Sequence, residues 1–306
     1  MEFLSYLING VSLGSIYAII ALGYTMVYGI AKMLNFAHGD VIMVGAYVSF
    51  YTTSFAANSL LGENPSALAS AGATLLSVLV AMAVCTVLGV IIEGLGYRPL
   101  RQAGSLAVLI TAIGVSYFLQ NGAQLLFGAN PVNFTPVISG QLTLFSGRLR
   151  ISYVALLTVA ACIVIMLALT AFTSRSKMGK AMRACSEDRG AAQLMGINVN
   201  RTISMTFAIG SALAAIAGVL LCSYSPVLKP TTGSMPGIKA FTAAVFGGIG
   251  SIPGAFLGGI LLGIIEAMAQ AYISTQLSNS ILFAVLIVVL LVKPSGLLGK
   301  YVPEKV

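Results

Sequence analysis

Long stretches of apolar residues recur along the chain, separated by short polar segments. In chain order they are residues 5–30, 37–56, 67–92, 105–127, 152–172, 203–224, 240–272 and 279–292. A helix needs about 20 predominantly apolar residues to cross a bilayer. Because lipid offers no hydrogen-bond partners, each span must pair its own backbone groups and is expected to be helical. The pattern predicts an all-α polytopic membrane protein.

The 240–272 stretch is long enough for two passes. The sequence FGGIGSIPGA (246–255) interrupts it, and glycine and proline are the strongest local breakers of a helix. We therefore expect a short pass or a re-entrant piece followed by a full span. This gives eight or nine transmembrane helices, some of them discontinuous.

Composition agrees with this class. Of the 306 residues, 58% are hydrophobic and only 8% are charged, against about 25% charged in an ordinary soluble domain. No polar segment is long enough to fold alone, so residues 1–306 are expected to form a single transmembrane domain. The start, MEFLSYLING, has no basic region, so we expect it to remain as the first span.

Basic residues predict the orientation. They concentrate in segments 93–104 and 173–201 and in the tail after residue 292, which places these parts in the cytoplasm. Segment 129–150 then forms a periplasmic loop, and the N-terminus lies outside if every apolar stretch is a full span. The net charge of +8 is explained by this bias, so no nucleic-acid partner is expected.

The four cysteines are far apart in the sequence, at Cys85, Cys162, Cys185 and Cys222. Their spacing indicates neither a disulfide framework nor a metal site. We interpret them as small packing residues.

Small residues recur at intervals of four, as in Gly10, Gly14 and Ala18, a spacing that lets helices pack closely in lipid. There is also a faint internal repeat. LGSIYAIIAL (13–22) resembles IGSALAAIAG (209–218), and the same offset places NFAHGD (35–40) on TTGSMP (231–236). Transporters with inverted repeats often place the substrate path at such paired interruptions, so an inverted repeat is possible here.

The polar segment 174–201 is predicted to form two short amphipathic helices. The first covers about 178–185, with Ala181, Ala184 and Cys185 on one face. For the second helix we expect Ser186 as the N-cap and Glu187 and Asp188 in the first turn. Its apolar face would be formed by Ala191, Leu194 and Met195, and Gly196 would be the C′ residue. Such a pair could lie on lipid headgroups or dock into a groove on a cytosolic partner. The acidic residues favour docking over binding to anionic lipid.

This segment resembles the loop by which permeases of ATP-binding-cassette importers engage their ATPase. The general signature is Glu-Ala-Ala, three residues, then Gly; here Gly190 replaces the glutamate before Ala191 and Ala192, and Gly196 keeps its place. Four longer segments, at 9–50, 97–101, 195–201 and 237–267, together resemble the H-type permease subunits of high-affinity leucine/isoleucine/valine importers. The resemblance covers nearly the whole chain in order.

The resemblance implies a bacterial inner-membrane complex that imports leucine, isoleucine and valine. Its expected partners are a second homologous permease, two cytosolic ATPases, a periplasmic binding protein and membrane lipid. The chain has no phosphate-binding G-x-x-x-x-G-K-[ST] loop, so ATP must bind to a partner, and we expect neither a cofactor nor enzymatic activity in this chain. The candidate ATPase-coupling residues are Arg183, Glu187, Asp188, Ala191, Ala192, Leu194 and Gly196.

The only histidine lies in LNFAHGDV (34–41), with Asn35, Gly39 and Asp40 beside it. One interpretation is a helix end near the membrane surface, where Asp40 caps the next helix and His38 binds a backbone carbonyl. The other is an unwound segment in the substrate path, since ionisable groups inside a membrane are costly and commonly functional. In that case the polar groups would bind a zwitterion, or Gly39 would give a gate its backbone freedom.

Four other polar residues lie in apolar surroundings. Glu266 is expected to be a buried hydrogen-bond partner or part of the substrate path. Glu93 is expected at the membrane surface beside Arg98, and Gln120 and Asn121 are expected to donate hydrogen bonds between helices.

Other classes remain as alternatives. A permease of a related urea or short-chain amide importer would share much of the pattern. A gradient-driven channel would leave segment 174–201 unexplained, and a secondary transporter would usually be about twice as long. A membrane enzyme would need a catalytic set that one histidine and scattered acids do not supply.

Overall fold

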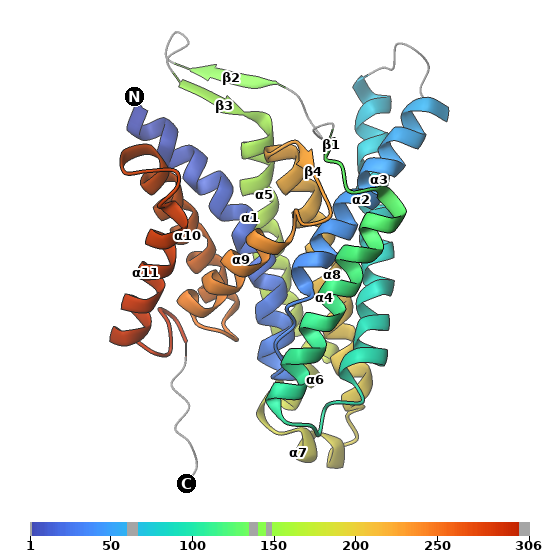
Figure 1. Cartoon of the computed structure of the whole chain (residues 1–306). Helices are drawn as coiled ribbons and strands as arrows, with labels where there is room; N and C mark the ends of the chain where they lie inside the picture. Colours follow the sequence, from blue (N-terminus) through green and yellow to red (C-terminus); the bar gives the residue numbers. More distant parts are fainter. Residues whose placement is uncertain (1, 60–66, 135–139, 145–148, 300–306) are drawn as a thin grey trace.

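The computed structural model describes residues 2–59, 67–134, 140–144 and 149–299 (Figure 1). The helices are α1 (Glu2–Ala31), α2 (His38–Ser59), α3 (Ala67–Ile92), the π-helical turn η1 (Glu93–Tyr97), α4 (Ser105–Phe127), α5 (Tyr153–Arg175), α6 (Lys177–Glu187), α7 (Arg189–Leu194), α8 (Val199–Tyr224), α9 (Ser234–Gly247), α10 (Ile252–Tyr272) and α11 (Ser278–Val292). The short strands are β1 (Val132–Asn133), β2 (Gln141–Leu144), β3 (Leu149–Ser152) and β4 (Val227–Leu228). The predicted all-α polytopic fold is confirmed.

The helices follow the apolar stretches of the sequence. In the described residues, six are long and apolar enough to cross a membrane, namely α1, α3 with η1, α4, α5, α8 and α10. The stretch at 240–272 divides into α9 and α10, as expected. The break contains Gly248 and Gly250 at φ values of 107° and 93°, which only glycine adopts readily.

The two ends of the helix bundle differ in charge. The C-terminal ends of α1 and α5, the start of α8, and helices α6 and α7 lie at the lower end in Figure 1, while the N-terminus and β1–β4 lie at the upper end. Segments 98–101 and 175–201, rich in arginine and lysine, belong to the lower end, which the positive-inside bias predicts to be cytoplasmic. This prediction places the N-terminus outside. Lys300, Lys305 and parts of the predicted periplasmic loop, 135–139 and 145–148, lie outside the described residues.

The two copies of the repeat found in the sequence lie at corresponding positions in the fold: α1 and α2 in the first copy, α8 and α9 in the second. α1 and α8 run in opposite directions in Figure 1. The helices that follow them begin at His38 and Ser234, and 234 − 38 equals the offset of 196 between residues 13 and 209. Two units of opposite direction at one sequence offset are what an inverted repeat requires.

Glycines determine how α1 packs. Gly14 lies against α10, where an added Cβ would be 2.7 Å from the Cα of Ile260. From the other side, Gly263 abuts Gly14 and Gly259 abuts Ala18. The small-residue stripes of the two helices therefore face each other, and every residue of α1 from Ser12 to Val27 is buried.

The cytoplasmic segment folds into α6 and α7, but its capping differs from the prediction. Asp188, not Ser186, is the N-cap of α7: its carboxylate accepts hydrogen bonds from the backbone N–H of Gly190 at 2.7 Å and of Ala191 at 3.0 Å. Glu187 is the last residue of α6 rather than a first-turn residue of α7. A carboxylate bonds two free N–H groups more strongly than the Ser186 hydroxyl would. Gly196 has the left-handed φ of 81° expected of a C′ residue.

The four cysteines are free and buried, as expected of packing residues. Cys185 on α6 packs with Met182 under the end of α1, together with Met26 and Ile30. Burial raises the pKa of its thiol above the usual value, so the thiol stays protonated and apolar in character.

Replacing Gly14 by alanine should destabilise the protein by about 1–3 kcal/mol, because the new methyl group would force α1 and α10 apart. Thermal unfolding in detergent measures the effect. Gly114→Ala on α4 is the matched control, since nothing lies within 4 Å of a Cβ added there. Equal melting temperatures for the two variants would show that the α1–α10 contact is not a tight one.

Candidate functional site

The LNFAHGDV segment connects α1 to α2 in the interior of the protein. The side chains of Asn35, His38 and Asp40 are all buried, so they do not lie at an exposed helix end. Residues 32–35 are neither helical nor in a strand, a turn follows at 36–37, and α2 begins at His38. Asp40 lies in the first turn of α2, where the helix dipole favours a negative charge.

The starts of α2 and α9 meet each other here. A Cβ on Gly39 would lie 2.7 Å from the carbonyl oxygen of Gly233, and one on Gly237 would lie 2.9 Å from the Cα of Gly39. Any side chain at Gly39 would separate the two backbones. The two interruptions paired in the sequence are therefore in direct contact.

One amide side chain on α4 joins both helix starts. Gln120 donates hydrogen bonds to the Asp40 carboxylate at 2.8 Å and to the Ser234 hydroxyl at 3.3 Å. Asn35 is held separately, since its amide oxygen accepts a hydrogen bond from the Tyr97 hydroxyl at 2.9 Å. No described lysine or arginine forms an ion pair with Asp40. Gln120 thus has the interhelical role predicted for it.

A cavity lies beside the start of α9. It has a volume of about 410 Å³ and is lined by residues of segment 221–236, among them Lys229, Thr231 and Ser234. Ser234 is therefore both part of the cavity wall and a partner of Gln120. Gln120 therefore connects Ser234 in the cavity wall to Asp40.

His38 faces α1 rather than Asp40. Its ring lies against Tyr24, with ring centroids 4.6 Å apart, and a Cβ on Gly23 would be 2.6 Å from Nε2. Nε2 is buried and has no hydrogen-bond partner among the described residues. The ring therefore fills space that Gly23 leaves open, and it holds the unwound segment against α1.

Glu266 lies in a second polar cluster, which connects α1, α9 and α10. Its carboxylate forms an ion pair with Lys239 at 2.7 Å and accepts hydrogen bonds from the Tyr17 hydroxyl at 2.9 Å and the Gln270 amide at 3.1 Å. The Lys239 ammonium also lies 5.9 Å from the centre of the Tyr17 ring. The sequence alone did not identify Lys239 as the partner of Glu266. The high cost of an unpaired charge in lipid was the signal that such a partner exists.

Two predictions about polar residues are wrong. Glu93 is buried in the protein, and its ion-pair partner is Arg101 rather than Arg98; it also accepts a hydrogen bond from the Ser204 hydroxyl at 2.6 Å. Glu93 begins a π-helical turn, which the sequence does not reveal. Asn121 donates to the Tyr117 carbonyl of its own helix at 2.7 Å, because it faces outward from α4.

The predicted coupling residues lie on the cytoplasmic end. Ala192 is buried against the protein, while Ala191 is exposed and Leu194 and Met195 are 90% and 83% exposed. Arg183 donates to the Ser174 carbonyl at 3.1 Å, which ties α6 to the end of α5. The exposed apolar pair lies on a short, capped helix and forms a protruding contact surface.

A polytopic bundle with two opposed repeats, whose interrupted helices meet at a polar centre, is the architecture of a membrane transport protein. The chain belongs to the family described as the branched-chain amino acid transport system / permease component, whose model matches residues 6–290.

Full-length relatives carry the same description. The chain is 48% identical to the high-affinity branched-chain amino acid transport system permease protein LivH of Salmonella typhimurium and to that of Escherichia coli K12, over 100% of this chain and 98% of each relative. It is 44% identical to the corresponding permease protein BraD of Pseudomonas aeruginosa, with the same coverage. No solved structure matches the chain.

Replacing Lys239 by methionine should destabilise the protein by about 3–5 kcal/mol, because the Glu266 carboxylate would lose its cation inside the bundle. Adding Glu266→Gln should restore much of that loss. Thermal or denaturant unfolding of the two single variants and the double variant measures the coupling between them. Additive losses would show that the pair does not interact.

Proposed function

We propose that this chain is the permease subunit of an ATP-driven importer that carries leucine, isoleucine and valine across a bacterial inner membrane. The observation that supports this most directly is the 48% identity to high-affinity branched-chain amino acid permeases over the full length of both chains. This support favours branched-chain amino acids over urea or short-chain amides, and an importer over a channel or a secondary transporter.

The proposed partners supply what this chain lacks. They are two cytosolic ATPases, which bind and hydrolyse the ATP, a second homologous permease and a periplasmic binding protein. The exposed Leu194 and Met195 on α7 support docking to an ATPase, since a soluble groove can cover apolar side chains that water does not. Arg183, Glu187, Asp188, Ala191, Ala192 and Gly196 shape and orient this contact.

The site where α2 and α9 meet is the proposed gate of the substrate path. Two helix N-termini directed at one point favour a carboxylate, and Asp40 offers an acceptor for an ammonium group; an amino acid carries both. In this conformation Asn35, His38 and Asp40 are buried, and Gly39 touches Gly233, so the gate is closed. Glu266 is already bound by Lys239, Tyr17 and Gln270, which supports a structural role for it.

Cells that lack this chain should regain uptake of labelled leucine, isoleucine and valine when it is supplied together with its partner subunits. Uptake of labelled urea and of a sugar should not change. Uptake of urea without uptake of leucine would overturn the proposed substrate class.

The same assay tests coupling to ATP. Leu194→Glu should abolish uptake and reduce copurification of the ATPases, because a charge would enter the apolar contact. Gln193→Glu, which adds a charge on the same short helix at a residue that is already polar and exposed, is the control. Full uptake by Leu194→Glu would exclude docking through this surface.

Asp40→Asn should reduce leucine uptake about tenfold or more, the effect of losing roughly 1.4 kcal/mol of interaction with substrate or gate. The amide has the shape of the carboxylate, so insertion and assembly should be unchanged. Glu2→Gln is the matched control, since Glu2 is also a first-turn acid but lies at the exposed end of α1. Equal uptake by the Asp40→Asn and Glu2→Gln variants would show that LNFAHGDV is only a structural break between two helices.

A further inference from the structure

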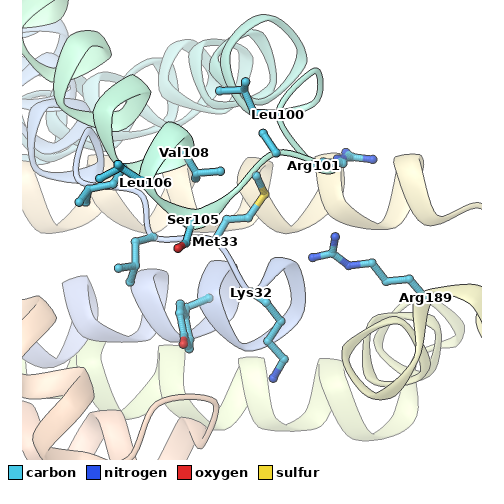
Figure 2. Close-up of a pocket in the computed structure, with 12 residues that line it drawn as sticks. Lys32, Met33, Leu100, Arg101, Ser105, Leu106, Val108 and Arg189 are labelled. Carbon is cyan, nitrogen blue, oxygen red and sulfur yellow. The ribbon is translucent and has the colours of Figure 1, made fainter.

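A cavity of about 590 Å³ opens at the cytoplasmic end, between the end of α1 and the start of α4. Figure 2 shows Lys32 and Arg101 on opposite walls and Arg189 extending toward them from α7. No acidic side chain is among the residues that line it.

Two of the three cations are available to a ligand. Arg101 is neutralised by its ion pair with Glu93. Arg189 donates a hydrogen bond to the Ala31 carbonyl at the end of α1, and neither Arg189 nor Lys32 forms an ion pair with a described carboxylate. Two uncompensated positive charges in one cavity attract an anion.

The backbone conformation of Lys32 also supports an anion site in this cavity. Lys32 ends α1 in the left-handed region, at φ 52°, with its N–H bonded to the Tyr28 carbonyl at 2.9 Å. Glycine or asparagine is the usual residue at such a helix end. A lysine in this conformation is unfavourable for the backbone, and this residue lines the cavity.

The start of α4 adds donors on the opposite wall. Ser105 and Leu106 line the cavity, and α4 begins there without a side-chain cap. The first N–H groups of a helix have no partner within the helix and carry a partial positive charge. Together with the Ser105 hydroxyl, they complement the two cations.

The remaining wall of the cavity is apolar. Met33, Leu34, Leu106, Val108 and Leu109 line it, and the cavity sits where two membrane-spanning helices, α1 and α4, reach the cytoplasmic side. A soluble anion would use the cations but not this apolar wall. A phospholipid uses both, and basic pockets between transmembrane helices on the cytoplasmic side are typical headgroup sites.

We propose that this cavity binds an anionic phospholipid of the inner leaflet. The lipid phosphate lies between Lys32 and Arg189, near the start of α4. One acyl chain follows the apolar wall toward the bilayer.

Native mass spectrometry of the purified full-length protein in detergent tests the proposal, with phosphatidylglycerol, phosphatidylcholine and inorganic phosphate as probes. Phosphatidylglycerol should bind the wild type more tightly than phosphatidylcholine. Lys32→Asn should weaken its binding about fivefold, the contribution of one basic residue near a membrane surface, and asparagine keeps the left-handed backbone. Lys32→Asn with Arg189→Gln should weaken it further, and Lys32→Arg should restore it.

Lys177→Gln is the matched control, since it removes an exposed cation from the same end of the protein but outside the cavity. Equal weakening by Lys177→Gln and Lys32→Asn would mean that only the general surface charge attracts lipid, and it would overturn the site. Binding of inorganic phosphate that competes fully with phosphatidylglycerol would assign the cavity to a soluble anion. Unchanged lipid binding in the Lys32 and Arg189 variants would also refute the proposal.

Discussion

Hydrocarbon accepts no hydrogen bonds, and this constraint determines where each polar side chain of the membrane-spanning part can lie. Glu266 is surrounded by Lys239, Tyr17 and Gln270. Glu93 meets Arg101 and Ser204, and Asp40 meets Gln120. Each of these groups joins two or more helices, so the same contacts that satisfy the polar atoms also fix how the helices are arranged.

Close packing of backbones makes these contacts possible. Glycine lets the helix backbones approach closely. Gly14 against α10 and Gly39 against Gly233 are the two places where this matters most. The first holds α1 in the centre of the bundle, and the second joins the two repeats where their helices are interrupted. A contact made of glycine alone is tight and yet carries no interlocking side chains, which suits the gate proposed there.

The two ends of the molecule present different surfaces. The periplasmic end opens a cavity that reaches Ser234 and, through Gln120, Asp40. The cytoplasmic end presents Leu194 and Met195 on α7, and beside them Arg189 at the basic cavity. Arg189 also binds the last carbonyl of α1, so a movement of α7 would be transmitted to α1 and to the segment at 35–40 that follows it. Membrane lipid and the proposed ATPase would then act on neighbouring parts of one element.

The amino-acid sequence was enough to predict the class, the helical stretches and the break at 246–255, because these depend on local hydropathy and glycine content. It also located the pair of interruptions, since the offset of the repeat is a property of the chain. Only the tertiary structure decided the partners of the polar residues. Lys239 is 27 positions from Glu266, Gln120 is 80 from Asp40, and Ser204 is 111 from Glu93. A buried carboxylate needs a hydrogen-bond donor whatever the fold, but the packing of the helices determines which donor lies within about 3 Å of it.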